Sequence, residues 1–150
     1  MNLEELYQEI LLDHYRRPRN FGVLEDADVL EHGVNPLCGD EIRISFKVEN
    51  GRVADVRFEG KGCSISKASA SMMTEAVRGK SLDEIRQFAN EIEKVLKGET
   101  EGDPERLGDL EALKGVSKFP VRIKCALLAW KVLEQGLERV EGEGRGEGPT

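Results

Sequence analysis

Three cysteines are the residues of this chain with the most informative chemistry, and each lies in a different segment. They occur in Leu37-Cys38-Gly39-Asp40, in Gly60-Lys61-Gly62-Cys63 and in Arg122-Ile123-Lys124-Cys125. Thiolates are good ligands for soft divalent metals such as zinc, and Asp40 offers an oxygen ligand two residues after the first cysteine. If the fold brings them together, a four-ligand metal site forms from Cys38, Asp40, Cys63 and Cys125.

The same residues also have simpler explanations. A free cysteine is a small buried hydrophobe in many proteins, and none of these three forms a C-x-x-C pair. Asp40 alone suits a turn or a helix cap, and Arg122 alone suits a solvated helix charge. His14 and His32 are expected at packing or surface positions rather than as ligands. Spacing alone therefore leaves buried thiols and a metal site both open.

The composition is that of one domain that keeps its thiols reduced. A chain of 150 residues can bury a sizeable core without disulfides. The cysteine count is odd and no stretch resembles a secretory signal or a transmembrane span, so we expect a cytoplasmic protein without a membrane partner. The net charge is −7 and no large basic block is present, which argues against nucleic acid as the main partner.

Helical periodicity predicts four helices, and capping signals mark where they begin. Asn2 with Glu5, and Ser81 with Glu84, form capping boxes. Pro120 suits the first position of the last helix. The expected helices span residues 2–17, 64–78, 81–97 and 120 to about 137.

Alternating hydrophobic residues predict an antiparallel sheet. Residues 41–48 alternate between apolar and polar side chains, and Asn50-Gly51 then provides a hairpin turn. On the return strand, Ala54, Val56 and Phe58 are expected to face the core. With the helices, these strands predict an α+β fold in which a small three-stranded antiparallel sheet packs against several helices.

The remaining segments are shorter or less regular. Residues 27–31 fit a short strand, and the polar residues 98–115 fit an irregular segment with one helical turn at 109–113. Residues 141–150 are mostly Gly and Glu, which predicts a disordered tail after a single domain of residues 1–140.

The predicted elements place the cysteines in loops or at helix starts, where side chains converge without disrupting a core. This position affects Cys63 most, because the partial positive charge at a helix N-terminus stabilises the thiolate and lowers the pKa of the thiol. Arg122 precedes Cys125 by three residues on one helix face, and with Lys124 it can offset the negative charge of the ligands. Asp40 is a hard ligand among soft ones, which predicts a labile site.

Four longer motifs resemble those of a known family. In order and spacing they are similar to the iron–sulfur cluster assembly proteins of the IscU/NifU N-terminal type, over about residues 3–140. This resemblance implies an IscU/SufU-like fold. The motifs are Asn35-Pro36-Leu37-Cys38-Gly39-Asp40, Phe58-Glu59-Gly60-Lys61-Gly62-Cys63-Ser64-Ile65-Ser66, Ala68-Ser69-Ala70-Ser71-Met72-Met73 and Lys118-Phe119-Pro120-Val121-Arg122-Ile123-Lys124-Cys125-Ala126.

Two features resemble the SufU branch of that family. The segment 98–115 is similar to an insertion that marks the branch, and Lys124 stands where the IscU branch has a histidine ligand. The resemblance implies a site with Arg122 beside it and zinc held by Cys38, Asp40, Cys63 and Cys125.

The resemblance also implies an activity and a partner. A type II, pyridoxal-phosphate-dependent cysteine desulfurase of the SufS kind would present a persulfide, and one of its histidines would take the zinc position that Cys38 vacates. Cys38 would then receive the sulfur, while Arg122 steadies the freed thiolate. The resemblance thus predicts a zinc-dependent sulfurtransferase that passes sulfur to a downstream cluster scaffold or another recipient.

Two other functions stay open. Cys38, Cys63 and Cys125 can also hold iron or a transient [2Fe–2S] cluster, which would make the chain a scaffold. A purely structural zinc site would instead make it a binding module that unfolds when zinc is removed.

Overall fold

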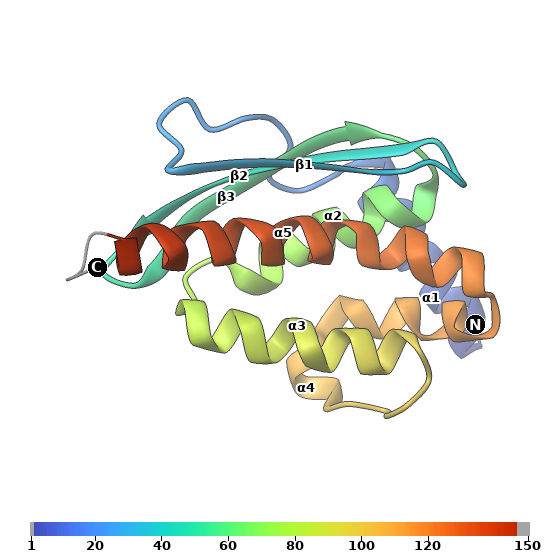
Figure 1. The fold of residues 1–150 in the computed structure, drawn as a ribbon. Coiled ribbons are helices and arrows are strands. Elements are labelled where there is room, and N and C mark those ends of the chain that lie inside the picture. The colour runs from blue at the N-terminus through green and yellow to red at the C-terminus, as the bar shows by residue number, and fades with distance from the viewer. Residues whose placement is uncertain (1, 147–150) are drawn as a thin grey trace.

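The computed structural model describes residues 2–146, with side chains through residue 141, as an α+β fold. A three-stranded sheet forms one layer, and the long helix α5 (Pro120–Gly146) and helix α2 (Ser64–Val77) pack beneath it (Figure 1). Helix α3 (Leu82–Leu96) lies on the far side of α5 from the sheet, and helix α1 (Leu3–Arg16) packs against α2. The predicted combination of a small antiparallel sheet with several helices is confirmed.

The sheet consists of β1 (Val29–Asn35), β2 (Asp40–Glu49) and β3 (Arg52–Lys61) in the order β1-β2-β3, all antiparallel. Asn50 and Gly51 have positive φ angles of 53° and 73°, as the predicted two-residue hairpin turn requires. β1 begins two residues later than expected and continues to Asn35, where it pairs with Asp40. This longer strand carries the chain directly to the loop that contains Cys38.

The predicted inward face of β3 is wrong at one position. The pairing places Lys47 opposite Asp55 but Val48 opposite Val53, so Ala54 is an extra residue that forms a bulge in β3 near the hairpin. Val53 is consequently the buried residue, whereas Ala54 is only partly buried. Val56 and Phe58 are buried as predicted, because they lie beyond the irregularity.

The predicted helix starts are confirmed by their caps. The Asn2 side chain accepts a hydrogen bond from the Glu5 backbone, and Ser81 with Glu84 forms a complete capping box. Helix α5 was predicted to end near residue 137, but it continues to Gly146. It therefore includes the first residues of the stretch 141–150 that was expected to be a disordered tail, and residues 147–150 lie outside the described part. The division of the chain at residue 140 stays a prediction.

The segment 98–115 is more regular than its polarity suggests. It contains a short helix, α4 (Pro104–Leu107), and a 3₁₀ helix, η1 (Gly108–Lys118), which continues up to the start of α5. Pro104 begins α4 and the Asp103 side chain caps it. The segment is ordered because it buries apolar side chains, namely Leu107, Leu110, Ala112, Leu113 and Val116.

One buried polar contact joins the two helices that carry Cys63 and Cys125. Ser69 of α2 donates a hydrogen bond of 2.6 Å to the Ala126 carbonyl and accepts one of 3.2 Å from the Trp130 indole nitrogen. Trp130 is fully buried, and its ring packs edge-on against Phe88 of α3. Among residues 2–146, no helix is both long enough and apolar enough to span a lipid bilayer.

Candidate metal centre

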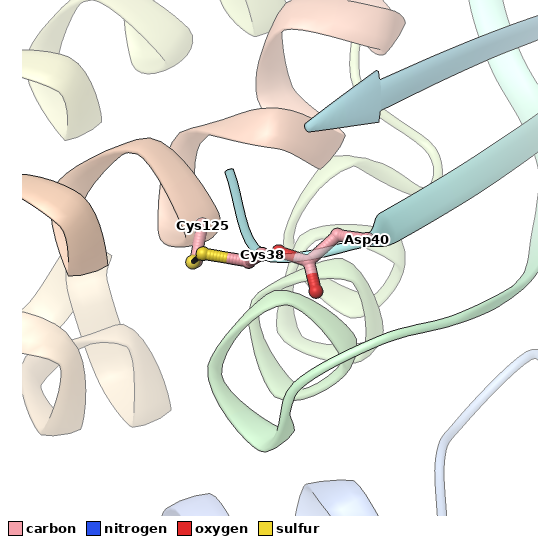
Figure 2. Close-up of side chains that lie close together, drawn as sticks. All are labelled: Cys38, Asp40 and Cys125. Atoms are coloured by element: carbon pink, nitrogen blue, oxygen red, sulfur yellow. Dashed lines mark hydrogen bonds between the residues drawn. The ribbon is translucent and has the colours of Figure 1, made fainter. Parts of the chain in front are cut away.

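The three segments that carry the cysteines meet at one end of the sheet. Cys38 lies in the loop between β1 and β2, Asp40 begins β2, and Cys125 lies in the second turn of α5. The ligand atoms of these three residues all lie within 4.8 Å of one another, and the two sulfur atoms are 2.9 Å apart (Figure 2). Convergence of residues 87 positions apart in the chain supports a metal site over three unrelated buried thiols.

Cys63 lies directly beside this trio. It is the N-cap residue of α2, and its Sγ accepts a hydrogen bond of 3.5 Å from the Ser66 backbone nitrogen. The Cys63 backbone nitrogen donates to Asp40 Oδ1 over 2.8 Å, and its Sγ lies 3.7 Å from Asp40 Oδ2. One carboxylate therefore links the start of β2 to the start of α2.

Glycine 62 makes this close approach feasible. Its φ is +149°, and a Cβ atom placed there would lie 2.2 Å from Asp40 Oδ1 and 2.9 Å from Asp40 Cα. No side chain fits between the Asp40 carboxylate and the backbone that it binds. Gly60 has a similar role in the sheet, where a Cβ would lie 2.1 Å from the Glu41 carbonyl oxygen.

The burial of the four side chains differs in a way that matters for chemistry. Asp40 and Cys125 are 1% and 2% exposed, whereas Cys38 and Cys63 are partly exposed. Burial raises the pKa of the Cys125 thiol, and hydrogen bonds with Cys38 and Cys63 raise it further. A metal that binds this sulfur must therefore displace its proton, because coordination requires the thiolate.

The four side chains offer the number and types of ligand that a four-coordinate zinc ion uses, and two of their distances can be compared with its geometry. With Zn–S and Zn–O bonds of about 2.3 Å and 2.0 Å, tetrahedral geometry requires sulfur pairs about 3.8 Å apart and a sulfur–oxygen pair about 3.5 Å apart. Cys63 and Asp40, at 3.7 Å, are close to the second value. Cys38 and Cys125, at 2.9 Å, would have to separate by about 0.9 Å, and Cys63 would have to move closer, since its sulfur is not among the ligand atoms that all lie within 4.8 Å of one another.

A cavity of about 500 Å³ opens onto the three sulfur atoms. α1 supplies one wall with Gln8, Leu11 and Leu12, and the start of α5 supplies Val121 and Arg122. Val121, which lines this cavity, is 52% exposed, and Leu37, next to Cys38 in the chain, is 64% exposed. The ligands thus lie at the base of a cavity with an apolar rim.

The two basic residues predicted beside the site have different positions. Arg122 lines the cavity, with its guanidinium group 4.4 Å from the centre of the Phe119 ring. Within the described residues no carboxylate pairs with it, so the cation stays available to the site. Lys124 instead lines a separate cavity with residues of β1 and α5, and it does not face the cysteines.

His14 was expected to be a packing or surface residue, and it is a buried one. Its Nδ1 lies 2.8 Å from Ser71 Oγ, and its Nε2 lies 2.8 Å from Asp109 Oδ2. It joins α1 to α2 and η1, away from the cysteines. His32 is exposed on β1 and lines another cavity.

Asn35 is a site residue that the sequence reasoning did not single out. Its side-chain nitrogen donates to Cys125 Sγ over 3.7 Å, and its backbone carbonyl accepts from the Cys38 nitrogen over 3.2 Å. Its place three residues before Cys38, within the same motif, was the only available signal. Its contact with Cys125 depends on how β1 packs against α5.

Comparison with known proteins identifies relatives of this chain. It is 50% identical over 141 residues to the zinc-dependent sulfurtransferase SufU of Bacillus subtilis (strain 168), covering 94% of this chain and 95% of that protein. It is 41% identical to the iron–sulfur cluster assembly scaffold protein IscU of Thermotoga maritima, over 93% and 98% of the two chains. A crystal structure assigned as a cluster assembly scaffold protein for the SUF system of Fervidobacterium islandicum AW-1 superposes with a TM-score of 0.82 at 34% identity, covering 91% of this chain and 99% of that one.

The family described as the NifU-like N-terminal domain matches residues 6–126. This range includes every candidate ligand and most of the ordered core. The chain therefore belongs to the NifU-like N-terminal domain family of iron–sulfur cluster assembly proteins.

Proposed function

We propose that this protein is a zinc-dependent sulfurtransferase in iron–sulfur cluster biogenesis, with Cys38 as the sulfur acceptor. The observation that carries the proposal is the position of Cys38. Its sulfur lies 2.9 Å from Cys125 at the base of an open cavity, in a loop whose neighbouring residues are exposed. The 50% identity with the Bacillus subtilis sulfurtransferase supports the same activity.

The transfer step needs one nucleophilic thiolate and one sulfur donor. Bound zinc would keep Cys38 deprotonated until the donor arrives. The Cys38 thiolate then attacks the terminal sulfur of the partner's persulfide. A new sulfur–sulfur bond forms on Cys38, the old one breaks, and the partner cysteine leaves as a thiolate. The sulfane sulfur moves between two cysteines with no added oxidant or reductant.

Arg122 is suited to steady the thiolate before and after this step. Three thiolates and a carboxylate carry more negative charge than a divalent ion neutralises, and Arg122 lines their cavity. Its guanidinium group rests on the Phe119 ring, a contact weak enough to be exchanged for a thiolate. Asp40 remains the fixed oxygen ligand because Cys63 donates to it.

The partner we propose is a type II cysteine desulfurase of the SufS kind, with a downstream scaffold or other sulfur recipient. A persulfide on a protein must be delivered into the cavity by a protruding segment. The exposed Val121 in the cavity wall and the exposed Leu37 beside Cys38 in the chain provide apolar contact for it. The three free cysteines suit the reducing cytoplasm, where a persulfide carrier avoids oxidation to disulfides.

The test is to incubate the zinc-loaded protein with the desulfurase and cysteine, and to map persulfide by mass spectrometry. We expect the added sulfur on Cys38, and we expect Cys38→Ala to abolish desulfurase stimulation. Cys63→Ala is the matched variant, because it removes a ligand while retaining the acceptor. Normal stimulation by Cys38→Ala would refute the proposal.

A cluster scaffold is the second candidate, favoured by 41% identity with the Thermotoga maritima scaffold protein. Three thiolates and one carboxylate are a sufficient ligand set for a [2Fe–2S] cluster. Anaerobic reconstitution with iron and sulfide would then produce visible absorption, and this absorption would be lost in Cys125→Ala. Zinc that resists replacement by iron argues against this role.

A further inference from the structure

The three sulfur atoms of the site have unequal hydrogen-bond partners. Cys63 Sγ accepts from the Ser66 backbone nitrogen over 3.5 Å and lies 3.7 Å from the Ser66 hydroxyl. Cys125 Sγ accepts from the Asn35 side-chain amide over 3.7 Å. Cys38 Sγ has only the Cys125 sulfur beside it, with no N–H or O–H donor within reach among residues 2–141.

We propose that Asn35 is a positioning residue that holds Cys125 as a permanent zinc ligand and thereby leaves Cys38 as the sulfur that detaches. The inference rests on the proposed zinc site, and it concerns which ligand leaves rather than whether sulfur is transferred. A donor to a thiolate withdraws electron density from the sulfur, which makes it less nucleophilic and harder to protonate. Of the three thiolates, only Cys38 lacks such a donor.

The orientation of the Asn35 amide is determined by its surroundings. Its Oδ1 accepts from the Leu37 backbone nitrogen over 3.3 Å, and only an oxygen can serve there. The amide nitrogen must therefore face Cys125. The side chain is 7% exposed, so water does not compete for this contact.

The same residue also controls the loop that carries Cys38. Asn35 ends β1 in register with Asp40, and its carbonyl accepts from the Cys38 backbone nitrogen over 3.2 Å. The Cys38 backbone is thus held while its sulfur is not. This separation lets the Cys38 side chain rotate away from the metal without disturbing Asp40, which Cys63 holds separately.

The decisive variant is Asn35→Asp, which keeps the shape and the oxygen acceptor for Leu37 but replaces the donor to Cys125 with an acceptor. Asn90→Asp is the matched control, because Asn90 is exposed on α3 and this substitution introduces the same charge. Asn35→Ser is a second test, since its hydroxyl can still accept from Leu37 but is too short to reach Cys125. Far-UV circular dichroism establishes that each variant is folded.

Three measurements are made on zinc- or cobalt-loaded protein. Iodoacetamide labelling, resolved by peptide mass spectrometry, should modify Cys38 first and Cys125 last in the unmodified sequence. In Asn35→Asp the labelling rate of Cys125 should rise about tenfold, and the zinc dissociation constant should rise about 10- to 100-fold. The sulfur-to-cobalt charge-transfer band should move to lower energy, because the sulfur lone pair loses its donor. Asn90→Asp should change none of these.

The result that overturns the proposal is a Cys125 labelling rate and a cobalt spectrum that stay unchanged in a folded Asn35 variant. Cys125 reacting as fast as Cys38 in the unmodified sequence also overturns it, and this needs no variant. The outcomes separate this inference from the proposed function. A protein that labels as expected but accepts no sulfur refutes the sulfurtransferase alone. A protein that accepts sulfur while labelling of Asn35→Asp is unchanged refutes only the role of Asn35.

Discussion

Gly62→Ala provides the sharpest test of how the Asp40 carboxylate is held. The added Cβ atom would lie 2.2 Å from Asp40 Oδ1 and 2.9 Å from Asp40 Cα. The second atom is backbone, so rotation of the Asp40 side chain alone cannot relieve the overlap. The Asp40 carboxylate must move away from the Cys63 nitrogen, which it now binds over 2.8 Å.

The expected loss of stability has two parts. An alanine at a positive φ costs about 1–3 kcal/mol. The hydrogen bond from Cys63 to a buried, charged carboxylate contributes about 1.5–3 kcal/mol, and it is lost with the displacement. Gly39→Ala is the matched control, because Gly39 has a φ of +70° in the same site but no atom within 4 Å of its added Cβ. Gly39→Ala therefore carries only the cost of an alanine at a positive φ.

Urea unfolding in the presence of a chelator measures both variants without any metal contribution. Gly62→Ala should be less stable than Gly39→Ala by about 1.5–3 kcal/mol. Its zinc dissociation constant, from competition with a chromophoric chelator, should also rise about 10- to 100-fold, since a ligand has lost its support. Equal losses in the two variants would refute the claim that Gly62 makes room for Asp40.

Two further predictions concern the elements behind the site. Tyr7 donates a hydrogen bond of 3.0 Å to Glu111, and burial together with that carboxylate raises the pKa of Tyr7 above its ordinary value. Its stabilisation should be fully present below about pH 10 and lost as the pH rises through the higher folded pKa, so the stability gap to Tyr7→Phe should narrow only above about pH 10; a gap that stays constant there contradicts this. Ser69→Ala removes the bond to the Ala126 carbonyl and leaves the buried Trp130 indole N–H without its partner, so it should cost about 2 kcal/mol in urea unfolding followed by tryptophan fluorescence. Ser64→Ala on the exposed start of α2 should cost much less, and equal losses would show that the buried contact is unimportant.

Local signals in the sequence were sufficient for most of the fold. The hairpin at Asn50-Gly51 and the capping box of Ser81 and Glu84 depend on residues within three positions of each other. The inward position of Val53 was missed because it follows from a bulge at Ala54, which depends on how β3 pairs with β2. A helical turn was predicted at 109–113, but the full extent of the 3₁₀ helix η1 was not, because its order comes from burial against distant helices rather than from its own periodicity.

In the candidate site, too, local features could be predicted from the sequence and contacts between distant residues could not. The ligand types at Cys38, Asp40 and Cys125 were recognisable from the sequence, and the structure brings them together. Their support was not recognisable, because a contact such as that of Asn35 with Cys125 joins residues 90 positions apart. Lys124 was expected beside the site, but the turn of α5 directs it into a different cavity.

The separation of Cys38 and Cys125 by 87 residues also determines when the site first exists during synthesis. A ribosome must translate most of the chain before the last sulfur emerges, and α5 must then dock on the sheet to bring it into place. A metal ion that meets the nascent chain earlier finds only Cys38, Asp40 and Cys63, an incomplete set of the candidate ligands. The complete set of candidate ligands therefore forms only after α5 has folded and docked.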